Sequence, residues 1–165
     1  MEQSGTAYFI RQIRCRRPDA VAIVSGSDKY PDLHGLISFC QTDMGVIVTS
    51  EVWGLPDPEE NCVKPVFAMH IHSGTSCTGN AEDPFADAGQ HYNPGGCEHP
   101  SHAGDLPPLF SNNGMAWSSV LTNRFTVQSV LGKTVIIHRQ PDDFTTQPSG
   151  NSGAKIACGV IRIMR

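Results

Sequence analysis

The sequence predicts an all-β fold, an antiparallel barrel or sandwich of eight short strands. Glycine and proline are plentiful among the 165 residues. The short runs between them are rich in Val, Ile, Thr and Phe, which favours half-buried strands over amphipathic helices. Many short strands separated by turn residues are typical of sheets that close on themselves and leave few edges exposed.

Eight segments along the chain fit such strands. In order, they are Ala20–Gly26, Leu33–Gln41, Gly45–Trp53, Val66–His72, Met115–Leu121, Arg124–Val130, Lys133–His138 and Lys155–Met164. The connections from Ser73 to Gly114 and from Arg139 to Ala154 are too long for hairpin turns, and long loops inside a domain are usually functional or disordered. Because both carry residues suited to chemistry, we interpret them as two functional loops.

Length and composition indicate one domain. The chain is long enough to enclose a single core, and no composition shift marks a second one. We expect an N-terminal arm over residues 1–17, whose arginine cluster is solvated, and one domain over residues 18–165.

Charge and hydropathy bear on the partners. A net charge of −4 argues against nucleic acid, because phosphate binding needs clustered basic side chains. No apolar run approaches the roughly 18 residues of a membrane-spanning helix, so we expect a soluble protein without a membrane partner. The N-terminus lacks the apolar stretch of a secretory signal, which favours the cytoplasm; export is expected only if the sequence was shortened at its start.

Six of the seven histidines follow a pattern of metal ligands. His70 and His72 end a predicted strand and lie on one face of it, because side chains alternate along a strand. The following loop and a later strand supply five further donors: His91, His99, His102, Asp105 and His138. Imidazole suits copper and zinc, and an aspartate oxygen can complete a zinc site. A histidine-only site and a mixed site are therefore expected.

Spacing alone does not assign these ligands. A single zinc clamp made by His99, His102 and Asp105 fits the same spacing, with the other histidines merely hydrogen-bonded. Cys97 lies two residues before His99, and thiolate is a good zinc ligand, so Cys97 is an alternative donor. Cys40, in a predicted strand, is expected to be a buried free thiol.

Five motifs carry a resemblance to a known family. They are His70-Ile71-His72, Gly89-Gln90-His91-Tyr92-Asn93-Pro94, His102-Ala103-Gly104-Asp105-Leu106, Val135-Ile136-Ile137-His138 followed by Asp142-Asp143, and the segment from Gly150 to Ile161. Together they resemble the copper/zinc superoxide dismutase family, over roughly Ala20 to Ile163. The resemblance implies a Greek-key β-barrel with copper and zinc as cofactors, and an enzyme that disproportionates superoxide to dioxygen and hydrogen peroxide.

Carried over residue by residue, the resemblance implies two metal sites that share one ligand. Copper would be bound by His70, His72, His91 and His138. Zinc would be bound by His91, His99, His102 and Asp105. The imidazole of His91 would bridge the metals and take part in catalysis by carrying a proton.

The resemblance also implies roles for residues around the metals. Asp142 would link His70 to His99, and carboxylates in such positions fix the orientation of the ligand rings. Cys77 and Cys158 would form an intrasubunit disulfide.

Lys155 departs from the family pattern, which usually has arginine there. Lysine offers a point charge on a flexible stem, so we expect it to attract the substrate anion but to dock it more loosely, with reduced activity. This departure and the short stretch between His138 and Lys155 keep one alternative open, a non-catalytic dismutase-like domain that binds zinc or carries copper. Family members occur as monomers and dimers, so a homodimer is also open.

Overall fold

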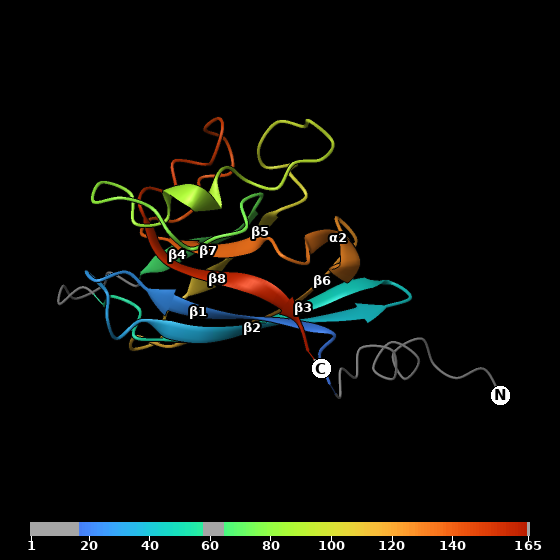
Figure 1. Ribbon diagram of the computed structural model, residues 1–165, viewed down its shortest axis with the longest axis horizontal. Helices are drawn as coiled ribbons and strands as arrows, with labels where there is room; N and C mark the ends of the chain where they lie inside the picture. The colour runs from blue at the N-terminus through green and yellow to red at the C-terminus, as the bar shows by residue number, and fades with distance from the viewer. Residues whose placement is uncertain (1–16, 58–64, 165) are drawn as a thin grey trace.

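The computed structural model describes residues 17–57 and 65–164, so nearly all of the predicted N-terminal arm lies outside the described residues. Within these ranges the strands are β1 (Ala20–Gly26), β2 (His34–Thr42), β3 (Gly45–Trp53), β4 (Val66–His72), β5 (Asp105–Phe110), β6 (Ala116–Thr122), β7 (Thr134–His138) and β8 (Lys155–Ile163). Two short helices, η1 (Ala86–Ala88) and α2 (Val127–Val130), lie in the connections (Figure 1).

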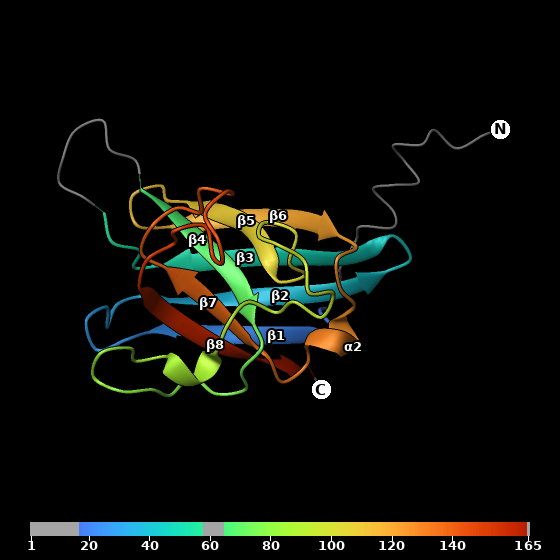
Figure 2. The ribbon, with the colours of Figure 1, turned by 90° about the horizontal axis from the view of Figure 1, so that it is seen from above.

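All eight strands belong to one antiparallel sheet. Their order is β5-β4-β7-β8-β1-β2-β3-β6, and β5 and β6, at the two ends of this order, contact each other. The sheet therefore curls into a nearly closed barrel (Figure 2). Several sheet neighbours, such as β4 with β7 and β3 with β6, are not consecutive in the chain, as in a Greek key. The predicted all-β Greek-key fold is confirmed.

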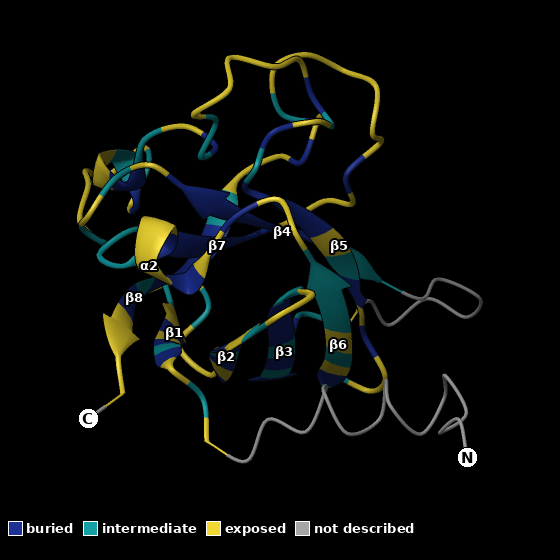
Figure 3. Cartoon of the chain, turned by 90° about the vertical axis from the view of Figure 1, so that its right-hand side faces the viewer, coloured by how far each residue is buried: buried dark blue, intermediate teal, exposed yellow. Residues whose placement is uncertain are grey.

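The strands differ in how far they are buried. In β1, Ala20, Ala22 and Val24 are buried while Ile23 is exposed, as expected for a strand with one face on the core and one on solvent. In contrast, β7 is buried throughout, and β4 is buried from its second residue onward. The two long loops cover the outer side of β4 and β7 (Figure 3), so polar residues on that side are shielded from water.

One predicted strand is wrong, and one strand of the structure was not predicted. The segment Arg124–Val130 contains the helix α2 instead of a strand, because the Thr126 side chain accepts a hydrogen bond from the Ser129 amide and caps a helical turn. The strand β5 lies within the predicted loop from Ser73 to Gly114. Its two central prolines obscure the strand pattern, but proline is tolerated at the end of a sheet, where fewer amide donors are needed.

A disulfide bond joins the first long loop to the sheet. Cys77, in the loop, is bonded to Cys158 in β8, as the resemblance implies. Cys40 is disulfide-bonded as well, so the prediction of a free thiol there is wrong. No helix in the described part of the chain has the length and apolarity needed to cross a membrane.

Candidate metal centre

The first group of donors forms where β4, β7 and the first long loop meet. His70 and His72 alternate with Met69 and Ile71, which lie in the barrel core, so the two imidazoles lie on the opposite side, under the loops. A β-bridge between His72 and His91 brings the loop onto β4. His138 ends β7 at an irregularity in its pairing with β8. One ring nitrogen from each of four buried histidines lies within 4.8 Å of the others: His70, His72, His91 and His138.

The second group adjoins the first and shares His91 with it. Its members, His91, His99, His102 and Asp105, each offer an atom within 4.8 Å of the others. Asp105 Oδ1 lies 2.8 Å from His91 Nδ1, and Asp105 Oδ2 lies 3.1 Å from His99 Nδ1. His102 Nδ1 lies 3.3 Å from His91 Nδ1. The Nδ1 atom of His91 therefore belongs to the second group, which leaves Nε2 for the first.

Unpartnered nitrogens indicate that both groups suit a metal. Among the residues that the structure describes, His70 Nδ1, His91 Nε2 and His99 Nδ1 are buried without a hydrogen-bond partner. A buried polar atom left in this way costs free energy unless something else satisfies it, and a metal ion would do so. The donor chemistry agrees: four imidazoles suit copper, and three imidazoles with one carboxylate suit tetrahedral zinc.

Asp142 orients one ring from each group. Its carboxylate accepts hydrogen bonds from His70 Nε2 at 2.9 Å and from His99 Nε2 at 2.8 Å. Each of these rings therefore carries its hydrogen on Nε2 and keeps the lone pair of Nδ1 for its donor group. Such bonds fix the tautomer and orientation of a ligand ring and tune the metal it binds.

The pKa values of three histidines and of Asp142 favour cation binding at neutral pH. Burial lowers the pKa of His70, lowers that of His72 well below its usual value, and lowers that of His138 to about 3. Burial alone would raise the pKa of Asp142, but hydrogen bonds from His70 and from the Phe144 amide outweigh it and lower that pKa to about 2. Neutral imidazoles beside an ionised carboxylate are the protonation states that metal binding requires.

Lys155 lies near the first group but is already paired. It lines a pocket of about 300 Å³ together with His72, His91 and His138. Its Nζ atom lies 2.6 Å from Asp83 Oδ2 and donates to the Phe85 carbonyl oxygen at 3.1 Å. The predicted anion-attracting charge is therefore partly neutralised by a carboxylate of the first long loop.

Cys97, the alternative zinc ligand, lies outside both donor groups. Its thiol is free and exposed, and the side chain of Asn93 binds its backbone amide and carbonyl groups. His99, in contrast, is buried and belongs to the second group. The structure thus places the histidine, and not the cysteine, next to Asp105.

Two contributors to the site were not predicted from the sequence. One is Asp83, the partner of Lys155. The other is Arg124, whose Nη1 atom donates to the carbonyl oxygens of Pro100, His102 and Asp105 at 2.9, 3.2 and 3.3 Å. Arg124 thereby holds together the loop that carries the second group. Neither residue belongs to a motif, and each lies far along the chain from the groups that it binds.

A Greek-key barrel with two adjoining donor groups that share one imidazole defines the class: β-barrel proteins with a paired metal centre. A family model described as copper/zinc superoxide dismutase (SODC) matches residues 33–161. The chain belongs to the copper/zinc superoxide dismutase family.

Individual relatives agree with this assignment. "Superoxide dismutase [Cu-Zn]" of Photobacterium leiognathi is 34% identical over 145 residues, which cover 78% of each chain. "Superoxide dismutase [Cu-Zn] 2" of Aquifex aeolicus is 33% identical over 143 residues, again 78% of each chain. "Superoxide dismutase [Cu-Zn]" of Deinococcus radiodurans is 29% identical over 153 residues, 82% of this chain and 80% of its own.

Proposed function

We propose that the first donor group binds copper and the second binds zinc. Copper is held by His70, His72, His91 and His138. Zinc is held by His91, His99, His102 and Asp105. The observation that carries this assignment is the position of His91, whose Nδ1 lies beside Asp105 while its buried Nε2 has no hydrogen-bond partner in the described part of the chain. One imidazole can then serve both metals.

The protein is an oxidoreductase that converts two superoxide anions and two protons into dioxygen and hydrogen peroxide. Bound copper supplies the one-electron redox chemistry, and zinc, which has no redox chemistry of its own, serves structure and electrostatics. The chain supplies the ligands, a proton and an attractive charge.

His91 is the residue we assign to proton delivery. Its Nδ1 side is fixed in the zinc group, while the residue lines the pocket that also contains Lys155. When His91 Nε2 does not bind copper, a proton held at that atom would be close to a small anion in the pocket. Lys155 adds a positive charge at the pocket wall, which raises the encounter rate of an anion with a protein whose net charge is −4.

Single-ligand variants test the metal assignment. His138→Ala removes a donor that belongs to the copper group alone, and His102→Ala removes one that belongs to the zinc group alone. We expect the first variant to lose copper and keep zinc, and the second to lose zinc first, as counted by metal analysis after dialysis. His34→Ala is the control, because His34 is exposed, stacks on Trp53 and belongs to neither donor group. Equal loss of both metals in both variants would contradict separate sites.

A homodimer stays a prediction. Several large apolar side chains are exposed by 60% or more: Ile23, Phe110, Trp117 and Ile163. Exposed apolar surface of this kind favours association when it is contiguous. Sedimentation equilibrium tests this directly, with twice the chain mass of 17.8 kDa expected for a dimer.

A further inference from the structure

Lys155 belongs to a closed ring of hydrogen bonds with two residues of the first long loop. Its ammonium group lies 2.6 Å from Asp83 Oδ2 and donates to the Phe85 carbonyl oxygen. Asp83 Oδ1 in turn accepts from the Phe85 amide at 3.0 Å. Asp83 therefore uses one carboxylate oxygen to order its own loop and the other to hold the ammonium group.

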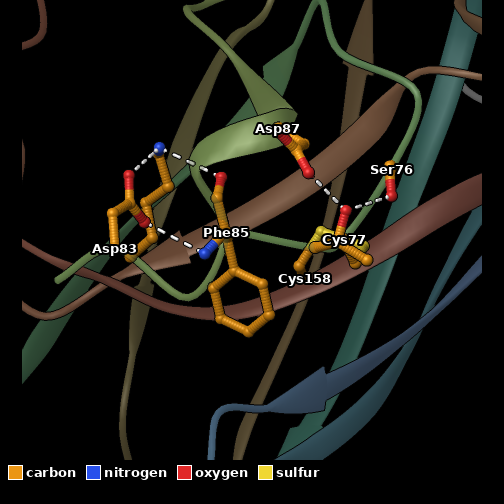
Figure 4. Close-up of a disulfide and its surroundings, with 8 residues drawn as sticks. Ser76, Cys77, Asp83, Phe85, Asp87 and Cys158 are labelled. Carbon is orange, nitrogen blue, oxygen red and sulfur yellow. Dashed lines mark hydrogen bonds and ion pairs between the residues drawn. A yellow bond between two sulfur atoms is a disulfide. The ribbon is translucent and has the colours of Figure 1, made fainter. Parts of the chain in front are cut away.

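The surroundings make this ring a defined part of the structure. The Phe85 side chain is buried in a small cluster with Ala88, Ile136 and Cys158, next to the disulfide (Figure 4). The Asn80 side chain accepts from the Asp83 amide at 2.9 Å. The loop is thus attached to β8 covalently at Cys158 and ionically three residues earlier, at Lys155, which limits how far the ammonium group can move.

The ion pair between Lys155 and Asp83 changes how strongly the pocket attracts an anion. Of the described residues, three with charged side chains line the pocket: Lys155, which is positive, and Glu82 and Asp83, which are negative. Opposite charges in direct contact form a dipole whose field decreases faster with distance than that of a single ammonium group. An approaching anion therefore meets a weaker attraction than unpaired Lys155 would provide.

We propose that Asp83 is a positioning residue that limits substrate attraction, because its carboxylate holds Lys155 at the pocket wall and offsets its charge. This inference rests on the proposed function, in which Lys155 attracts superoxide. Removing the carboxylate charge, and with it the acceptor of the Lys155 ammonium group, releases the attraction. Asp83→Asn is the suitable change, since its amide oxygen still accepts from the Phe85 amide and orders the loop, while its NH₂ group cannot accept from Lys155.

The experiment measures kcat/KM for superoxide against ionic strength in the copper- and zinc-loaded protein, and the affinity of azide for its cupric form by optical titration. We expect Asp83→Asn to raise kcat/KM and azide affinity by about threefold or more at low salt. As salt is added, kcat/KM should decrease more steeply than in the parent protein. Glu82→Gln, which removes the same charge from the same pocket without touching Lys155, should give a smaller gain. Glu51→Gln, on β3, controls for net charge.

The same change in a Lys155→Met background separates the possible outcomes. If Asp83 acts through Lys155, then in the Lys155→Met background Asp83→Asn raises kcat/KM and azide affinity no more than Glu82→Gln does. A full gain in that background, or no gain in the parent protein while Lys155→Met still lowers kcat/KM, overturns the role of Asp83 and leaves the proposed function intact. Wild-type rate and salt dependence in Lys155→Met would instead refute the role of Lys155 itself, and the inference with it.

Discussion

The Nε2 atoms of His72 and His138 lie 3.2 Å apart, although the residues are 66 positions apart in the chain. The Nδ1 atom of His72 is bound to the Gly89 carbonyl oxygen and that of His138 to the Gly153 carbonyl oxygen. Since a carbonyl oxygen can only accept, both hydrogens sit on Nδ1 and both Nε2 lone pairs point into the donor group. Two facing lone pairs are unfavourable unless a cation lies between them.

Removal of the metals is therefore expected to destabilise the fold. A ligand that binds only the folded state, present at a free concentration a thousand times its Kd, stabilises that state by about 4 kcal/mol. We expect the melting temperature in calorimetry to fall by several degrees when chelators remove both metals, and to recover when the metals are added back. An unchanged melting temperature would show that the donor groups do not bind metal in solution.

The stability of the metal-free protein should depend on pH. His138 has a pKa of about 3 when folded, against 6.5 for a free side chain, so the unfolded chain binds more protons between these values. The free energy of unfolding should then fall as pH decreases from about 6.5 towards 3. Asp142, whose folded pKa is lowered to about 2, adds a further loss of stability below about pH 4.

Denaturant titrations at a series of pH values measure this dependence. His138→Gln removes one titrating group and should give a shallower slope between pH 6.5 and 3. A slope equal to that of the parent protein would contradict the contribution assigned to His138.

Asp142→Asn should weaken zinc binding. A neutral amide offers one accepting oxygen in place of two, so it cannot accept from both His70 and His99, and its NH₂ group would face one of the rings. Loss of such a carboxylate typically lowers metal affinity about 10- to 100-fold. Competition with a chromophoric chelator measures the change. Asp143→Asn is the matched control, because Asp143 binds the exposed threonines of its own turn; equal effects of the two variants would contradict a specific role for Asp142.

Arg124→Met should loosen the loop that carries the second donor group. The change removes hydrogen bonds to three carbonyl oxygens, and a bond from a charged donor is worth about 1.5–3 kcal/mol. We expect a lower melting temperature and faster release of zinc to a chelator, with partial recovery in Arg124→Lys. Zinc release at the parent rate would mean that the loop keeps its shape without Arg124.

The sequence predicted the parts of this structure that are encoded locally. The alternation in β4 places His70 and His72 on one side of the strand, and seven of the eight predicted strands agree with the structure to within one residue at each end. β5 was missed because prolines hide its pattern, and α2 was missed because one capping side chain overrides the strand preference of its residues.

Contacts that the fold creates between distant residues were not predictable. Lys155 and Asp83 are 72 positions apart, and no feature of either segment indicates the pair. Arg124 is likewise 19 to 24 positions from the carbonyl groups that it binds, and any residue can supply a carbonyl oxygen. Motifs identified the candidate ligands, whereas the structure was needed to find what surrounds them.

The most direct test of the central claim counts copper and zinc per chain and measures superoxide removal on the same sample. We predict one copper and one zinc per chain, with turnover far faster than that of free copper, and loss of this turnover in His138→Ala. Zinc alone, or bound copper with turnover no faster than that of the free ion, would contradict the account and indicate a metal-binding domain without catalysis.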